Sequence, residues 1–325
     1  MMRRLGPFYI ALMAASLLAG CGILDRSASF PSRPITGVSA YEAGAFTDTL
    51  VRPAWEIMGK ELGQPIMVVN KPGAGGTVGL RDVAESKPDG YTIGVCAALA
   101  YAKQLGQINI NHRDLDVIGV VAAAPPGLWV RADSPWKTTK DLVEAAKAKP
   151  GQITLSTSSA PGHFWLVVKM FEKQAGITFN IVQATGGGAM ATQQLAGEQV
   201  ESGVFGFVES QSMYQAGKIR PLAVFGANRL PDPYKDIPTA LEQGYSIKDE
   251  GNVLVPMVGP KGMPKEALDK LRASMLKASG SQEYLNAVGK YGASPAKLAG
   301  DEAMAYLDQM AKTFEPLIEG LGLKK

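Results

Sequence analysis

Short apolar runs rich in Val and Ile alternate along the chain with longer amphipathic stretches, a pattern typical of an α/β protein. The clearest unit begins with Ile66–Val69, which predicts a buried parallel strand. Gly75-Gly76 then open a helix that ends near Pro88, and Tyr91–Val95 predicts the next strand. Strand, small-residue turn, helix and strand within ~30 residues form one βαβ unit with a right-handed connection. We therefore predict the α/β class.

Three further segments repeat the order of strand, small-residue turn and helix. The predicted turns lie at 41–47, 158–163 and 185–189. The strands before them are predicted at 34–40, 153–157 and 179–184, and the helices after them stop at Gly63, Gly176 and Gly197. Thr47 is the N-cap that we expect for the first of these helices. Open α/β sheets bind ligands where such turns gather, although small residues also serve simply to make tight turns.

None of the three turns contains Lys or Arg. A helix N-terminus still favours an anion, because its unpaired N–H groups and the helix dipole give it partial positive charge. An anion held here would bind backbone N–H groups, waters and the hydroxyls of Thr47, Ser158 and Ser159 rather than form an ion pair. The turns are therefore a candidate anion site.

The rest of the chain continues the same pattern. Further strands are predicted at 116–121, 127–130, 204–207, 221–226 and 253–258. Further helices are predicted from Thr138, which has Asp141 three residues later as in a capping signal, from about 237–239 to Gly244, after Met263-Pro264, and from Asp301 to about Ile318. We find no sequence repeat of 20–50 residues, which excludes a solenoid.

Composition excludes several classes of protein. The chain has 325 residues, of which 46% are hydrophobic, enough for one large domain or two medium lobes with sizeable cores. The formal net charge is only +3, and two of the basic residues, Arg3 and Arg4, lie in the N-terminal leader. Basic and acidic residues are therefore nearly equal in number, and the chain lacks the excess of positive charge that binds nucleic acid. We predict no nucleic-acid partner.

Residues 1–20 have the layout of a secretory signal peptide, with a basic start, a short apolar run and small residues before Cys21. Leu18-Ala19-Gly20-Cys21 resembles a bacterial lipobox, in which cleavage leaves the cysteine lipidated; an ordinary signal with an incidental cysteine is the alternative. We therefore predict a lipidated N-terminus and flexible stalk at 21–32, and a periplasmic protein tethered to a membrane through Cys21. Cys96 then has no disulfide partner and is predicted to be a small buried apolar residue.

The sequence carries no recognisable catalytic motif. Its two histidines, His112 and His163, form no HExxH, and no cysteine cluster exists, so we predict no metal site. Neither G-x-S-x-G nor GxxxxGK[ST] occurs. The segment from Gly73 to Gly79 misses the dinucleotide fingerprint because residue 78 is Val. We therefore predict neither a cofactor nor an enzyme; catalysis by residues without a known motif is the alternative.

VVNKPGAGGTVG followed by KPDGYTIG resembles the signature of the tripartite tricarboxylate transporter substrate-binding receptors, the Bug or TctC-like family of periplasmic binding proteins. The resemblance covers most of the mature chain. It implies a two-lobe periplasmic binding protein fold of type II, in which each lobe is a sheet flanked by helices and the ligand cleft lies between the lobes. It would place lobe one at 33–130 plus 250–325, and lobe two at 131–249.

The same resemblance implies a function. The protein would be a monomeric receptor that captures a small organic acid, in this family mostly a carboxylic acid, and delivers it to the membrane permease of a tripartite tricarboxylate transporter. One alternative is an orphan receptor that presents its ligand to a sensor protein, and a second is an enzyme on the same scaffold.

The resemblance also assigns ligand contacts to the three turns and to the end of the second strand. Gly44, Thr47 and Asp48 match the family pattern in the first turn, whereas Ala45 and Phe46 replace glycines. The ligand-binding residues that we predict are Tyr41, Gly44, Ala45, Phe46, Thr47, Asp48, Ala97, Ala98, Ser158, Ser159, Gly162, His163, Gly186, Gly187, Gly188 and Ala189. His163 is as typical of an exposed residue at a helix start as of a ligand contact.

Several departures from the family pattern suggest an apolar cleft. Trp165 stands where the family has His, Thr185 replaces a common Lys, and Ala97-Ala98 stand where relatives often have Ser or Thr. With Phe46, these changes predict a monocarboxylate or dicarboxylate with an aromatic or aliphatic body. The alternative is that Phe46 and Trp165 pack into the cores of the lobes. Glu42 beside the first turn disfavours a highly charged anion.

Overall fold

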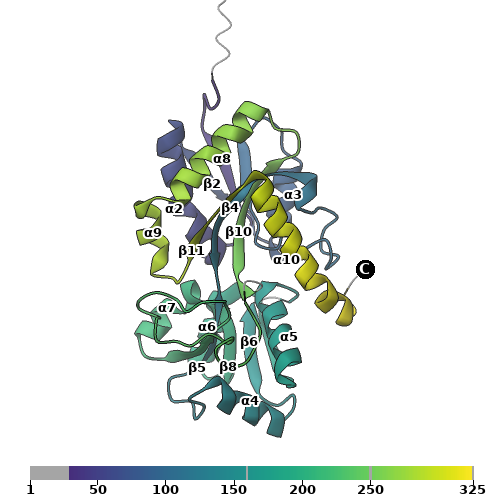
Figure 1. Cartoon of the computed structure of the whole chain (residues 1–325), viewed down its shortest axis with the longest axis vertical. Coiled ribbons are helices and arrows are strands. Elements are labelled where there is room, and N and C mark those ends of the chain that lie inside the picture. The colour runs from purple at the N-terminus through teal and green to yellow at the C-terminus, as the bar shows by residue number, and fades with distance from the viewer. Residues whose placement is uncertain (1–28, 159, 249–250, 324–325) are drawn as a thin grey trace, which may run out of the picture.

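The computed structural model of the chain describes residues 29–158, 160–248 and 251–323. They form two lobes, each built on one mixed sheet (Figure 1). The first sheet has the order β11-β4-β10-β3-β1-β2, with β1 Ile35–Ser39, β2 Ile66–Asn70, β3 Thr92–Val95, β4 Leu115–Ala124, β10 Val253–Pro260 and β11 Ser294–Ala299. The second sheet has the order β7-β6-β8-β5-β9, with β5 Pro126–Arg131, β6 Thr154–Ser158, β7 Asn180–Ala184, β8 Ser202–Gly206 and β9 Ile219–Val224. The predicted α/β two-lobe fold is confirmed.

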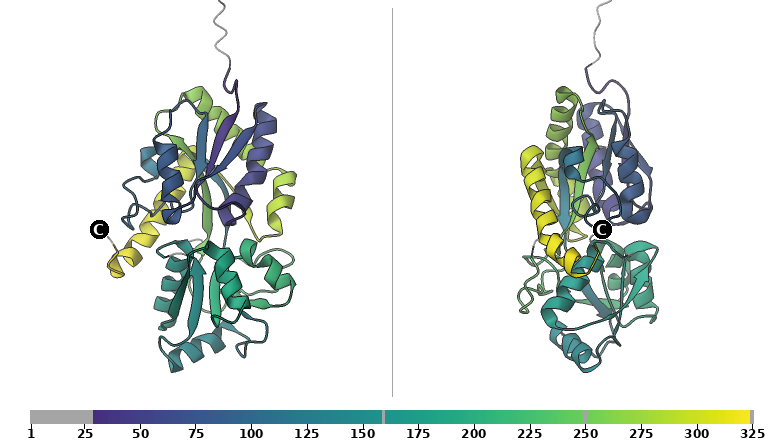
Figure 2. Two further views of the ribbon diagram at one scale, coloured as in Figure 1. Left: turned by 180° about the vertical axis from the view of Figure 1, so that it is seen from behind. Right: turned by 90° about the vertical axis from the view of Figure 1, so that its right-hand side faces the viewer.

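Helices cover both faces of the first sheet (Figure 2). One face buries apolar side chains of α2 Phe46–Leu62, α8 Lys265–Ser279 and α9 Gln282–Gly289. The other buries those of α3 Thr77–Ala84, which follows the short 3-10 helix η1 Ala74–Gly76, and of α10 Gly300–Gly320. A second 3-10 helix, η2 His112–Asp114, precedes β4. The second sheet is flanked by α4 Thr139–Ala148, α5 His163–Ala175, α6 Gly187–Ala196 and α7 Phe207–Gln215.

The chain crosses between the lobes at two adjacent places. It leaves the first sheet after Ala124 and enters the second at Pro126, and it returns to the first sheet at Val253. Ala124 and Val253 are paired neighbours in the antiparallel ladder between β4 and β10. Both crossings are therefore held together by the same ladder, directly beside the space between the lobes.

Among the described helices, none is long and apolar enough to cross a membrane. Cys21 and the predicted signal peptide lie outside the described residues.

Three expectations about local structure are wrong. The strand β2 is not buried: it lies at the edge of the first sheet, and Met67 is 57% exposed because alternate side chains there face solvent. Thr47 is not the N-cap of α2, because Ala45 holds that position. No helix forms from 237 to 244, because Pro238 and Ala240 exchange backbone hydrogen bonds with Val224 of β9 instead.

The predicted cap of α4 is confirmed and gives a test of the second lobe. The Thr138 hydroxyl accepts a hydrogen bond from the Asp141 N–H (3.2 Å), and the Asp141 carboxylate accepts one from the Thr138 N–H (2.9 Å). We expect Thr138→Ala to lower the free energy of unfolding by about 1 kcal/mol, since it removes one side of this capping box. Urea unfolding measures this loss of stability, and Thr178→Ala, at an exposed loop position, is the control. Equal midpoints for the two variants would contradict the assignment.

Candidate functional site

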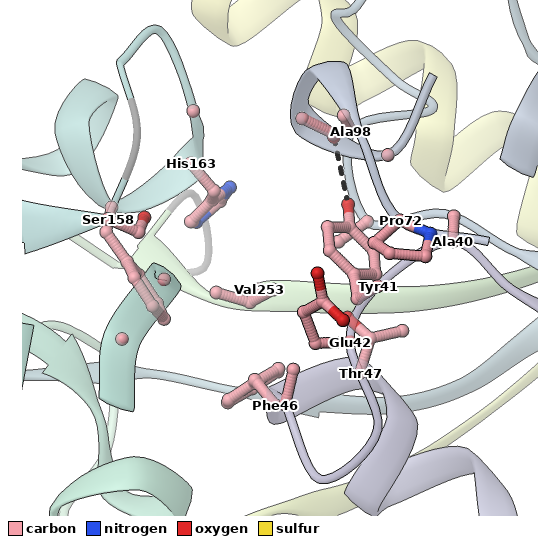
Figure 3. Close-up of a pocket in the computed structure, with 18 of the residues that line it drawn as sticks. Ala40, Tyr41, Glu42, Phe46, Thr47, Pro72, Ala98, Ser158, His163 and Val253 are labelled. Atoms are coloured by element: carbon pink, nitrogen blue, oxygen red, sulfur yellow. Dashed lines mark hydrogen bonds between the residues drawn. The ribbon is translucent and has the colours of Figure 1, made fainter. Parts of the chain in front are cut away.

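A cavity of about 370 Å³ lies between the lobes, with residues of both in its lining. In Figure 3, Ser158 and His163 of the second lobe face Tyr41 and Glu42 of the first, and Val253 of the returning crossing lies between them. The volume of the cavity is at the lower end of the range for sites that bind small molecules. Its lining comprises Ala40, Tyr41, Glu42, Ala43, Gly44, Ala45, Phe46, Thr47, Pro72, Gly73, Ala74, Gly75, Gly76, Ala97, Ala98, Tyr101, Ser158, Gly162, His163, Phe164, Thr185, Gly186, Gly187, Gly188, Ala189, Glu209 and Val253.

The structure therefore brings together nearly all of the residues predicted from the sequence. Asp48 is the exception among those described, because its side chain is fully buried behind the first turn. Ser159 lies outside the described residues. Glu209, Tyr101 and the turn Pro72–Gly76 also line the cavity and were not predicted. That turn follows a strand and precedes a helix, so the criterion applied to the other three turns could have found it.

Asp48 holds the first turn in place. Its Oδ2 accepts hydrogen bonds from the Gly44 N–H (2.8 Å) and from Arg52 Nε (2.6 Å), while its Oδ1 accepts one from the Asn70 side-chain amide (2.8 Å). Burial alone would raise the pKa of Asp48, but the hydrogen bonds from Arg52, Gly44 and Asn70 outweigh it and the pKa is lowered. The turn is thus fixed from behind by an ionised carboxylate before α2 begins.

Tyr41 covers the Pro72–Gly76 turn. Its hydroxyl lies 3.4 Å from the Gly75 carbonyl oxygen, to which it donates. Gly76 has a φ of +99°, and a Cβ there would lie 2.9 Å from the Tyr41 ring, so only glycine lets the ring pack this closely. Cys96 is 1% exposed, which confirms the prediction of a buried residue, and burial raises the pKa of its thiol to about 11. A thiol in that environment is unreactive at neutral pH.

His163 is buried rather than exposed at the helix start, and it lines the cavity. Its Nε2 lies 3.0 Å from the Gly251 carbonyl oxygen, so this nitrogen carries the proton and donates it. The ring also contacts Tyr101, in the segment after β3, and Phe314 of α10, both in the first lobe. Burial lowers the pKa of His163 to about 4, so the imidazole is neutral at physiological pH and its Nδ1 is an acceptor.

Phe46 and Trp165 differ in their surroundings. Phe46 lines the cavity and also packs edge-on against Phe164 of the second lobe, with ring centroids 6.1 Å apart. Trp165 is not among the described residues that line the cavity; it packs beside α10 and the Lys169 ammonium group lies 5.5 Å from its ring centroid. Phe46 therefore contributes apolar surface to the cavity, whereas Trp165 does not.

The third turn meets the cavity at the start of α6, where Gly187 has a φ of +74°. Behind it lies Glu209, which belongs to the first turn of α7. A Cβ built on Gly188 would lie only 2.6 Å from Glu209 Oε1, so glycine at this position leaves room for the carboxyl group. No Lys or Arg lies among the described lining residues, and they include two carboxyl groups, those of Glu42 and Glu209. The part of the chain that the structure describes contains no cluster of side chains suited to a metal ion.

Two α/β lobes joined by adjacent crossings around a cavity define a periplasmic solute-binding protein. A family model described as the tripartite tricarboxylate transporter family receptor, TctC, matches residues 50–323. The chain therefore belongs to the tripartite tricarboxylate transporter receptor family, as its sequence signature predicts.

Individual relatives agree with this assignment over nearly the whole chain. A "UPF0065 protein in gbd 5'region" of Cupriavidus necator is 31% identical over 317 residues, which are 97% of this chain and 95% of that protein. The solved structure of the periplasmic binding protein BugD is 29% identical, with a TM-score of 0.81, and covers 91% of this chain and 100% of that one. A structure described as a periplasmic transporter is 26% identical, with a TM-score of 0.83, covering 91% and 99%.

The burial of His163 makes stability depend on pH. Between pH 6.5 and about 4 the unfolded chain binds a proton at this ring that the folded chain does not. Stability from this group is therefore complete above pH 6.5 and falls by up to about 3 kcal/mol as the pH drops through that window. We expect His163→Gln to flatten this part of the pH profile, as measured by urea unfolding at pH 7.5, 6 and 5. A His163→Gln profile as steep as the wild type would be the contrary result.

Proposed function

We propose that the receptor binds a small carboxylic acid in the cavity between its lobes and delivers it, as a monomer, to the permease of a tripartite tricarboxylate-type transporter. The family to which the chain belongs supports the transporter partnership. Two features of the cavity support the type of ligand: three helix N-termini meet there, and its walls are partly apolar.

The observation that carries the proposal is the meeting of three helix N-termini at one cavity. The first residues of α2, α5 and α6 all contribute to the lining, and they come from both lobes. N–H groups in a first helical turn have no carbonyl partner within their own helix, and the helix dipole adds partial positive charge. Because no Lys or Arg is present among the described lining residues, these partial charges suit one carboxylate better than a highly charged anion.

The walls of the cavity suit an apolar ligand body. Phe46 and Phe164 contribute aromatic surface, and Ala97, Ala98 and Val253 contribute small aliphatic surface. Such walls remove apolar atoms of a ligand from water, which stabilises binding in proportion to the area covered. We therefore retain a monocarboxylate or dicarboxylate with an aromatic or aliphatic body as the proposed ligand.

The two crossings are the proposed hinge. Ala124 and Val253 are paired where the chain passes between lobes, so the lobes would close over the ligand by bending at this ladder. The predicted end of lobe one at 130 is wrong, because β5 Pro126–Arg131 belongs to the second sheet; we propose that lobe one ends at Ala124 and resumes at Val253, with lobe two between these crossings.

A screen of acids by thermal shift tests the ligand class. We expect benzoate-like and short aliphatic acids to raise the melting temperature by several degrees at millimolar concentration, since ligand bound only to the folded state stabilises it. Citrate should have no such effect. The panel includes adipate and malate, which accompany two solved structures of this fold that are 24% and 23% identical to this chain. A clear preference for citrate, or no shift with any acid, would contradict the proposal.

Lipid attachment at Cys21 stays a prediction, and it is tested separately. Mass spectrometry of the protein extracted from membranes should show an N-terminal cysteine carrying acyl chains, since two or more chains are needed for stable anchoring. A Cys21→Ser variant that remains in the membrane fraction, or an unmodified N-terminus elsewhere, would exclude the anchor.

A further inference from the structure

Two side-chain hydrogen bonds between described residues cross from one lobe to the other. Gln107 of the first lobe donates through its Nε2 to the Pro161 carbonyl oxygen of the second, at 2.8 Å. Gln211 of the second lobe donates through its Nε2 to the Lys290 carbonyl oxygen of the first, at 3.3 Å. We call Gln107 and Gln211 the bridging glutamines. Each lobe therefore supplies one donor and one acceptor to the other.

The two bonds lie on different sides of the second lobe. Pro161 comes just before the start of α5, whereas Gln211 belongs to α7, and Figure 1 shows α5 and α7 on opposite sides of that lobe. Neither bridging glutamine is among the described residues that line the cavity. Both bonds therefore form without a ligand and leave the cavity free to accept one.

The surroundings of Gln107 hold its side chain between the lobes. A Cβ built on Gly75 would lie 3.4 Å from Gln107 Nε2, so the amide group packs against a turn of the first lobe that lines the cavity. Earlier in the same segment, Gln104 donates to the Ala311 carbonyl oxygen at 3.1 Å and so ties the segment to α10. Gln107 therefore connects a cavity turn of the first lobe to the second lobe.

The Gln211 bond belongs to a larger contact between the lobes. Its acceptor, Lys290, lies in the loop between α9 and β11, close to Gly292. A Cβ built on Gly292 would lie 2.7 Å from Leu230 Cδ1 of the second lobe, so only glycine leaves room for this approach. The loop is therefore packed closely on the second lobe next to the residue that accepts the bond.

We propose that the bridging glutamines hold the lobes in the described arrangement before a ligand binds, and so act as positioning residues for ligand binding. The inference rests on the proposed function through its hinge, and it does not depend on the class of ligand. The paired crossings at Ala124 and Val253 join the lobes at one place, and the two bonds add contacts on either side that restrict twisting as well as opening. The helix N-termini of both lobes then already face one cavity when a ligand arrives.

The two bonds favour the described arrangement without locking it. Each amide group exchanges a bond to water for a bond to protein, so losing one such bond changes an equilibrium by only about three- to tenfold. Gln107 Oε1 is buried without a hydrogen-bond partner among the described residues, which destabilises this arrangement in part. A receptor that already populates the binding arrangement binds any ligand more tightly than one that must first close.

Distances between spin labels measure how the lobes are arranged in the ligand-free protein. Arg81→Cys on α3 and Gln193→Cys on α6 place labels at exposed positions of two helices, each of which follows a cavity turn of its own lobe. The labels are attached in the Cys21→Ser protein, in which buried Cys96 does not react. With both bridging glutamines present, we expect one main distance, that of the described arrangement.

Replacing both donors should lengthen this distance. Gln107→Glu with Gln211→Glu keeps the size of the side chains, but at pH 7.5 each carboxylate repels the carbonyl oxygen that the amide group had bound. Gln107→Ala with Gln211→Ala should change the distance in the same direction. Gln215→Glu, at the exposed end of α7, is the matched control and should leave the wild-type distance. The melting temperature of each variant shows whether it folds.

Affinity provides a second readout, which a purely structural role in one lobe would not move. Calorimetry at pH 7.5 measures the binding of benzoate and of adipate. We expect the double alanine variant to bind both acids more weakly by the same factor, about threefold or more, because the variant changes the population of the binding arrangement and not the cavity. The ratio of the two affinities should therefore stay constant.

The outcomes separate this inference from the proposed function. Equal label distances in the wild type and both double variants, or an open arrangement of the ligand-free wild type, would overturn the inference and leave the receptor function intact. A changed preference between benzoate and adipate would overturn it as well, because the glutamines would then act on the cavity itself. A lengthened distance in the variants, with neither acid bound by the wild type, would support the bridging glutamines and contradict the proposed ligand.

Discussion

The relation between the two lobes depends on the pairing of Ala124 with Val253. These residues are neighbours in the ladder between β4 and β10, and the chain crosses between lobes directly beyond each of them. Because both crossings belong to one ladder, the proposed closure of the lobes would bend or twist the chain at this pair. Val253 also lines the cavity, so movement at the crossings changes the shape of the site.

The polar character of the cavity comes from the backbone and not from ion pairs. Three helices begin at its edge, and Asp48, which follows the first turn, is buried and paired with Arg52. A site of this kind offers an anionic group N–H donors whose positions are set by the helices. It lacks the strong long-range field of a cationic site, and its described lining includes the carboxyl groups of Glu42 and Glu209.

Local pattern was enough to predict the fold class, the capped start of α4 and the turns that line the cavity. Each of these depends on residues close together in sequence, such as Thr138 with Asp141. The same reasoning failed where distant pairing decides the structure: Thr239 and Glu242 exchange hydrogen bonds like a helix cap, yet the backbone there pairs with Val224. Glu209 could not be predicted as a site residue because α7 follows β8 without a turn, so neither the helix nor its direction is visible in the pattern.

Most of the aromatic residues that join the lobes also line the cavity. Phe46 of the first lobe packs on Phe164 of the second, and His163 of the second lies against Tyr101 and Phe314 of the first. The His163 N–H also holds Gly251, two residues before Val253 at the crossing. A ligand in the cavity therefore contacts side chains whose positions already depend on how the lobes meet. A ligand shifts the equilibrium between two forms of a protein only by the difference in its affinity for them. The shift here therefore depends on how much more tightly the ligand binds the form described here than a more open form.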